Sequence, residues 1–64
     1  MNDQFINEIF NKLRDRELHE YRVPKDQFLA FRTVIVSRPD FKNFRGIAQR
    51  GGDVIYTYLD EPRS

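Results

Sequence analysis

The sequence predicts an α+β fold in which two N-terminal helices pack on a C-terminal β-hairpin. Three observations lead to this prediction. Apolar residues recur at helical spacing near the start, a proline divides the first half, and a Gly-Gly pair separates two β-prone segments near the end. The 64 residues suffice for one small domain, which we place at residues 1–60, followed by a mobile tail at 61–64.

The first helix is predicted to begin at Asn2 or Asp3, because either side chain can cap the free backbone N–H groups of a helix start. We expect the charged segment 14–20 to continue the helix for one or two turns. Val23-Pro24 then interrupts it, since the residue before a proline avoids the α region. The apolar stripe of this helix recurs at i, i+3, i+4 and i+7, and its members are Phe5, Ile6, Ile9, Phe10 and Leu13.

The second helix is predicted to begin with Pro24, whose missing N–H costs nothing in a first helical turn, and to end near Ser37. The four consecutive β-branched residues 33–36 favour a strand instead. A short strand at 32–37 is therefore the alternative for this segment.

Gly51-Gly52 predicts a two-residue hairpin turn between Phe44–Gln49 and Val54–Leu59, because two glycines readily adopt positive φ. This register places Ile47 opposite Tyr56 and Arg45 opposite Tyr58. One face then carries Arg45, Ile47, Gln49, Val54, Tyr56 and Tyr58. The other face carries Phe44, Gly46, Ala48, Ile55, Thr57 and Leu59.

A competing prediction makes residues 39–49 a short helix, capped by Gly51. Segments 24–37 and 39–50 would then form a helix-turn-helix-like, three-helix core with a C-terminal strand. Gly46 would lie inside that helix at a cost of about 1 kcal/mol relative to alanine, which weakens this alternative.

The residue inventory argues against catalysis and predicts a protein that is not an enzyme. There is no cysteine, a single histidine (His19) and no glycine-rich phosphate loop. We therefore expect no cofactor, no metal and no small-molecule substrate. No apolar run approaches the roughly 20 residues that span a bilayer, so we expect no membrane partner and a cytoplasmic location.

The charge is uneven, although the net charge is only +1. Residues 21–50 carry seven basic and two acidic residues between two acidic ends, a pattern that fits either self-neutralisation or a basic face. The predicted hairpin is apolar on both faces, and two helices can cover only one of them. The spare face predicts binding to another protein or to a second copy in a homodimer. The expected partner-binding residues are Tyr56, Tyr58, Ile47, Arg45 and Arg50.

The alternative function is nucleic-acid binding, because basic residues alternate with aromatic ones in the central segment. The residues expected to carry it are Arg38, Lys42, Arg45 and Arg50. Small size and missing catalytic groups also suit a regulator, such as a phage or mobile-element inhibitor of a host factor. That last idea is a hypothesis about small proteins rather than a reading of particular residues.

Overall fold

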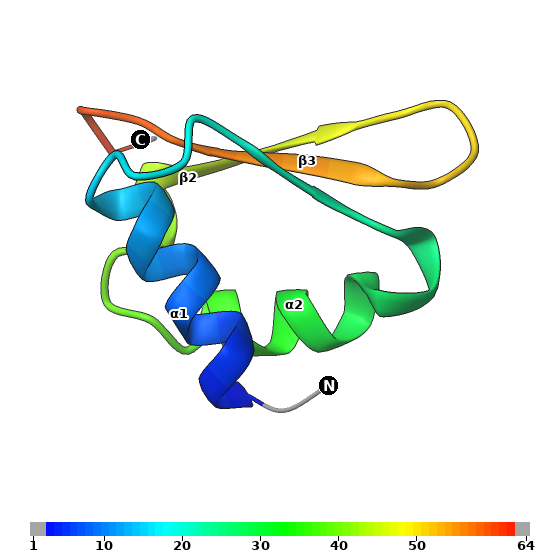
Figure 1. Cartoon of the computed structure of the whole chain (residues 1–64), viewed down its shortest axis with the longest axis horizontal. Coiled ribbons are helices and arrows are strands. Elements are labelled where there is room, and N and C mark those ends of the chain that lie inside the picture. Colours follow the sequence, from blue (N-terminus) through cyan, green and yellow to red (C-terminus); the bar gives the residue numbers. More distant parts are fainter. Residues whose placement is uncertain (1–2, 63–64) are drawn as a thin grey trace.

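The computed structural model describes residues 3–62 and contains two helices on one side of a three-stranded antiparallel sheet (Figure 1). The strand order is β1-β3-β2. This arrangement confirms the predicted α+β class, in which two helices are followed along the chain by a C-terminal hairpin. The elements are α1 (Asp3–Arg14), β1 (Tyr21–Val23), α2 (Phe28–Val36), β2 (Phe44–Ala48) and β3 (Val54–Tyr58), with 3₁₀ turns η1 (Lys25–Gln27) and η2 (Phe41–Asn43).

Helix α1 buries the predicted stripe except for Phe5, which is 44% exposed at the first turn. Asp3 lies in that first turn, while Asn2, the other predicted start, is outside the described residues. The helix ends at Arg14, so the predicted continuation through 14–20 is wrong.

The chain leaves α1 through Arg16, whose φ of 67° is in the left-handed region. The Arg16 N–H donates to the Leu13 carbonyl at 3.2 Å, and the Glu17 N–H donates to the Lys12 carbonyl at 2.9 Å. These two bonds are the Schellman pattern, which usually has glycine at the left-handed position. Because these bonds satisfy the last backbone carbonyls of α1, the helix ends here even though helix-favouring residues follow.

Strand β1 was not predicted from the sequence. Its three residues pair antiparallel with β3, Tyr21 opposite Tyr56 and Val23 opposite Val54. Val23 is fully buried, and the Tyr21 ring stacks on Phe31 with centroids 5.8 Å apart. Pro24 therefore follows a strand and does not interrupt the first helix, which has already ended at Arg14. The residue before a proline is held extended, which suits the last position of a strand.

The β-branched residues 33–36 are helical, so the strand alternative at 32–37 is wrong. The predicted start at Pro24 is wrong, because Pro24 only precedes the 3₁₀ turn η1 and α2 begins at Phe28. The predicted end near Ser37 is confirmed: Ser37 caps α2, and its N–H donates to the Val34 carbonyl. Phe31, Val34 and Ile35 are buried against the core, and this burial outweighs the β preference of the run. The helix predicted as an alternative at 39–49 is also wrong, since residues 44–48 form β2.

The hairpin forms, but its predicted register is wrong by one residue. The Gln49 N–H donates to the Asp53 carbonyl at 2.7 Å, so the loop holds three residues, Arg50 to Gly52, rather than two. Gly51 (φ 93°) and Gly52 (φ 101°) both take positive φ. Phe44 now faces Tyr58, and Gly46 faces Tyr56. A slip of one residue moves every side chain of one strand to the other face.

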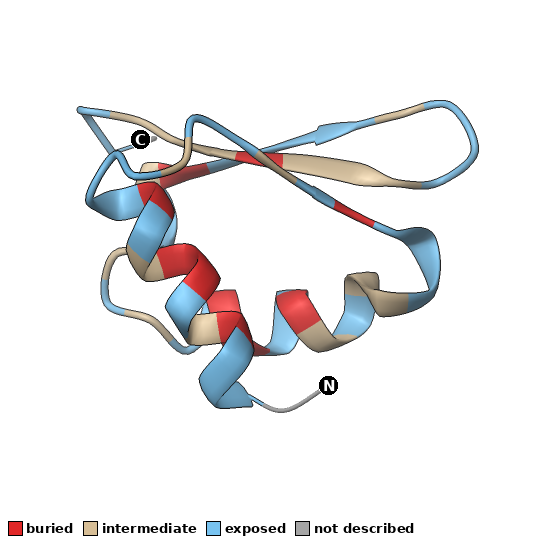
Figure 2. Cartoon of the chain, viewed as in Figure 1, coloured by how far each residue is buried: buried red, intermediate tan, exposed pale blue. Residues whose placement is uncertain are grey.

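The core lies between the helices and the sheet, where the buried segments of the two layers face each other (Figure 2). The Phe10 ring makes edge contacts with Phe31, Phe44 and Tyr56 at centroid separations of 5.8, 5.0 and 5.6 Å. The observed register brings these aromatic rings together, whereas the predicted one would have turned the tyrosines outward. Of the predicted tail, Glu61 and Pro62 are exposed, and residues 63–64 lie outside the described part of the chain.

Candidate functional site

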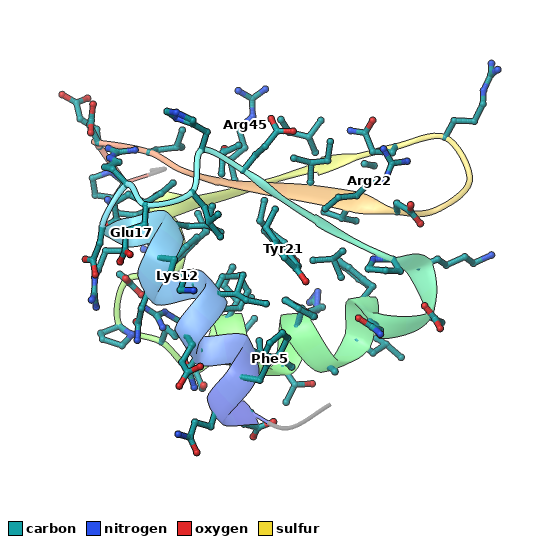
Figure 3. The ribbon with its side chains drawn as sticks, viewed as in Figure 1. Phe5, Lys12, Glu17, Tyr21, Arg22 and Arg45 are labelled. Carbon is teal, nitrogen blue, oxygen red and sulfur yellow. The ribbon has the colours of Figure 1, made fainter. Side chains whose placement is uncertain are left out.

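The predicted binding face is divided between the two sides of the sheet. Tyr56 is only 6% exposed and lies beneath the sheet, toward the helices. Ile47, 38% exposed, and Arg45 lie on the opposite side, paired with Ile55 and Thr57. Figure 3 shows Arg45 pointing away from the helices, as Arg22 does on β1, while Tyr21 points toward them. The five predicted residues therefore do not form one surface.

Tyr58 is held within the fold rather than displayed on its surface. Its half-buried ring makes an edge contact with Phe44 at 5.0 Å, and the Arg16 guanidinium lies over the ring at 5.2 Å. Arg16 also donates to the Tyr58 carbonyl at 2.8 Å and pairs with Asp60. Arg50, the remaining predicted residue, is exposed in the hairpin loop.

An apolar groove of about 430 Å³ opens where α2 leaves part of β2 uncovered. We call it the β2 groove. Its lining comes from α2, η2 and the helix-facing side of β2 and β3: Phe28, Arg32, Ile35, Val36, Phe41, Phe44, Gly46, Ala48, Val54 and Tyr56.

Gly46 leaves room for the Tyr56 ring in the lining of this groove. A Cβ atom at position 46 would come within 3.2 Å of Cε1 of Tyr56 and 3.3 Å of Cγ1 of Val54. Such contacts are tight, so a side chain here would crowd the Tyr56 ring. Val36 and Phe41, on the groove wall, remain 53% and 36% exposed. The groove thus offers apolar side chains that the chain itself leaves partly uncovered.

The outer edge of β2 borders the groove and carries free backbone groups. Among the described strands, only β3 pairs with β2. The hydrogen-bonded pairs Gln49–Asp53 and Asn43–Leu59 set the alternation of an antiparallel ladder, so residues 45 and 47 bond to β3. The N–H and C=O groups of Gly46 and Ala48 and the C=O group of Phe44 therefore point outward and are free, whereas the Phe44 N–H donates to the Phe41 carbonyl at the end of η2. The side chains of Phe44 and Ala48 face the groove, and Gly46 lines it between them.

A basic rim surrounds this edge. The two segments that border it, 28–36 and 41–52, contain Arg32, Lys42, Arg45 and Arg50 and no acidic residue. None of these four forms an ion pair with another residue of the range 3–62. Arg32 and Tyr56 both line the groove. Burial raises the pKa of Tyr56 even though the charge of Arg32 acts the other way, so the hydroxyl is neutral at pH 7.

Of the residues predicted for nucleic-acid binding, Arg38 is committed to internal contacts. It forms a bidentate ion pair with Asp40 at 2.9 and 3.1 Å and donates to Oδ1 of Asn7 at 2.9 Å. Its guanidinium also lies over the rings of Phe10 and Phe44. Lys42, Arg45 and Arg50 remain exposed. The aromatic platform predicted beside Arg45 is not formed, because the tyrosines lie on the other face of the sheet.

The sequence signals that could have revealed this site were indirect. In the sequence, Gly46 weakens the helix alternative and Val36 belongs to the β-branched run at 33–36, so neither residue marks a groove by itself. The acid-free basic segment was visible in the charge pattern. The groove itself depends on how α2 crosses the sheet, which no local pattern encodes.

Fold and site together define a small two-layer α+β protein in which an open strand edge borders an apolar groove. Residues 3–57 match the family described as YkzS-like protein. Because this match covers most of the chain, the protein belongs to the YkzS-like family. No curated protein and no solved structure matches it.

Two further findings concern the described residues. None of their helices is long and apolar enough to cross a membrane. In the same range, no group of three or more His, Cys, Asp or Glu side chains gathers where it could hold a metal ion.

Proposed function

We propose that this chain is a non-enzymatic binding protein that contacts another protein through the β2 groove and the adjoining strand edge. The observation that carries the proposal is the coincidence of the two features. The apolar groove and the unpaired backbone groups of Gly46 and Ala48 lie side by side. An exposed strand edge is a template for pairing with another chain, and apolar pockets beside it add affinity.

Charge supports the same surface. Arg32 lies on the groove wall, and Lys42 and Arg50 flank the ends of β2. These three basic groups form no ion pair within residues 3–62, so they are available to an acidic partner and speed its encounter electrostatically. Of the residues first expected to bind, Arg45 and Arg50 belong to this rim. Tyr56 contributes one wall, and Ile47 and Tyr58 lie outside the groove.

A matched pair of variants on α2 tests the proposal. Val36 lines the groove, whereas Leu29, 74% exposed on the same helix, does not. The tagged chain would be used to capture proteins from cells that naturally carry it. We expect Val36→Gln to lose a captured protein that wild type and Leu29→Gln retain in equal amounts. Equal capture by all three chains would contradict a role for the groove.

Nucleic-acid binding is the second candidate, favoured by the unpaired basic groups of Lys42, Arg45 and Arg50 around one edge. Binding to generic DNA and RNA, followed by fluorescence anisotropy across a salt series, separates the candidates. Phosphate-driven binding weakens steeply as salt rises. The absence of binding at low salt would remove this candidate.

A regulatory role would follow from the same contact. A protein whose strand is held at the β2 edge is blocked from its own partners, which is how a small inhibitor acts. Inhibition of a host factor, as from a phage, remains a prediction that depends on identifying the captured protein.

A further inference from the structure

We propose that the β2 groove receives an extended, acidic peptide segment of the partner, which adds to β2 as a fourth, antiparallel strand. This inference rests on the proposed function and names the kind of segment that is bound. It is carried by three features of the described residues: the direction of the free backbone groups, the faces of the β2 side chains, and the charges around the edge.

The backbone geometry selects a strand over a helix. The outward C=O groups of Phe44, Gly46 and Ala48 recur at every second residue, with the free N–H groups of Gly46 and Ala48 beside them. A peptide helix satisfies its own backbone groups and would leave these unpaired, whereas an extended chain can pair with all of them. The other strand pairs of this sheet are antiparallel, and antiparallel pairing is slightly more stable per residue.

The side-chain pattern of the peptide follows from this pairing. Peptide residues in hydrogen-bonded pairs with Phe44, Gly46 and Ala48 point their side chains to the same face, into the β2 groove. The middle one lies opposite Gly46, beside the Tyr56 ring that packs against this glycine. These positions call for apolar residues. The residues between them point to the other face, beside Arg45.

The charge pattern calls for acidic residues at those intervening positions. Arg45 would lie opposite one of them in a non-hydrogen-bonded pair, where Cβ atoms are about 4.5–5.5 Å apart. Lys42 and Arg50 lie just beyond the two ends of β2. A peptide that alternates acidic and apolar residues therefore matches both faces of the edge.

A second copy of this chain matches the edge less well. Two β2 strands paired about a two-fold axis at Gly46 would place Lys42 of each copy opposite Arg50 of the other. Like charges in directly opposite positions are destabilising. Gly46 of each copy would also face Gly46 of the other, so neither copy would supply a side chain to the groove at that position. The charge pattern thus favours an acidic peptide over a homodimer.

The first test uses the whole wild-type chain and a synthetic peptide, acetyl-Glu-Val-Glu-Val-Glu-Val-Glu-amide, titrated by NMR. We expect shifts in the amides of residues 44–48 and none in those of residues 3–14. Two N-methylated peptides give the matched comparison. Methylating the three valine nitrogens removes the donors that face β2 and should weaken binding at least about tenfold. Methylating the last three glutamate nitrogens should change binding by no more than about twofold.

Failure of the unmethylated peptide to bind at low salt would overturn the proposal. So would equal effects of the two methylated peptides, because binding would then not depend on the strand edge. A larger effect from the glutamate set would overturn antiparallel addition.

Charge is tested with a peptide in which lysine replaces every glutamate. We expect it to bind at least about tenfold more weakly than the acidic peptide, and the acidic peptide itself to bind less tightly as salt rises. Equal binding of the two peptides at low salt would contradict acidic recognition.

A pair of variants at one position tests the edge from the side of the protein. Ala48→Pro removes an N–H that points outward and leaves the β2–β3 bonds intact, whereas Ala48→Val keeps that N–H. We expect only the proline variant to lose the strand-edge contact. It should then bind the two methylated peptides with equal affinity, whereas Ala48→Val should still bind the valine-methylated peptide more weakly than the glutamate-methylated one. If a folded Ala48→Pro chain still binds the two methylated peptides with different affinities, the proposal is overturned.

Failure of the acidic-strand proposal can be told apart from failure of the proposed function. If the peptide does not bind but Val36→Gln still loses a captured protein, the groove binds something other than an acidic strand. If Val36→Gln captures as wild type does, the groove is not the contact surface at all.

Discussion

Arg38 joins three separate parts of the chain through one side chain, of which only 10% is exposed. Its guanidinium pairs with Asp40, bonds Asn7 on α1 and covers the rings of Phe10 and Phe44. The planar group can satisfy these partners together because its N–H donors point in fixed directions. This residue therefore stabilises the junction between α1 and the segment that leads into β2.

We predict that Arg38→Lys lowers the free energy of unfolding by about 1–2 kcal/mol, because an ammonium group cannot make the bidentate pair with Asp40. Urea denaturation followed by circular dichroism measures this change. Arg45→Lys, on the exposed face of the sheet, should change stability by less than about 0.5 kcal/mol. Equal losses from both variants would show that Arg38 contributes no more than a surface charge.

Asp53 connects the hairpin to the segment around β1. Oδ2 accepts from Nε of Arg22 at 2.9 Å, and Oδ1 accepts from the backbone N–H of Lys25 at 3.0 Å. The hydrogen bond from Arg22, followed by that from the Lys25 N–H, lowers the pKa of Asp53 in the folded chain. The unfolded chain then binds a proton more readily than the folded one as pH falls.

The sign of this shift gives a pH prediction. The stabilisation by the Asp53 carboxylate is complete above its unfolded pKa of about 3.9 and is lost as pH falls through the lower folded pKa. We expect the stability difference between wild type and Asp53→Asn to be constant near neutral pH and to shrink below about pH 4. Thermal unfolding across a pH series measures it. A difference that stays constant throughout would contradict the assignment.

At the scale of elements, the end of α1 depends on Arg16 in the left-handed region. This conformation costs a non-glycine residue about 1 kcal/mol. The side chain offsets the cost through its contacts with Tyr58 and Asp60 at the end of β3. One residue thus both stops the helix and attaches that stop to the sheet.

Two substitutions at Arg16 separate the backbone effect from the side-chain effect. Arg16→Gly and Arg16→Ala both remove the guanidinium, but only alanine keeps the strained φ. We expect the glycine variant to be more stable than the alanine variant by about 1 kcal/mol in chemical denaturation. Equal stability would mean that the left-handed position is not retained once the guanidinium contacts are gone.

At the scale of the whole molecule, stability depends on a few aromatic rings. Phe10 is fully buried and contacts rings contributed by α2, β2 and β3. A domain of this size has a single core that rarely supplies more than about 3–5 kcal/mol. Removing the central ring therefore affects every layer of the fold.

We predict that Phe10→Ala, which should cost about 3–5 kcal/mol, leaves most of the chain unfolded at 25 °C. Leu29→Ala, at an exposed site on α2, should change stability by less than about 0.5 kcal/mol. Circular dichroism and thermal melts of both variants measure the effect. A cooperative melt of Phe10→Ala near that of wild type would contradict a single core centred on this ring.

The types and places of the main elements could be inferred from the sequence because each leaves a local signal. The spacing of Ile6, Ile9, Phe10 and Leu13 indicated α1, and the Gly51-Gly52 pair indicated the hairpin. The end of α1 could not be inferred, since the left-handed position holds Arg16 rather than glycine. Strand β1 could not be inferred either, because its three residues are too few to show the alternation of apolar and polar side chains that marks a strand.

The composition and order of residues were enough to determine the helices, the hairpin and the basic middle segment, because these arise from neighbours in the chain. Packing decided the rest. A three-residue loop buries Tyr56 beside Phe10, whereas the predicted two-residue loop would expose it, and a one-residue slip exchanges the two faces. The β2 groove exists because α2 crosses the sheet without covering Gly46 and Ala48. Contacts between residues far apart in sequence set both outcomes, so local patterns do not contain them.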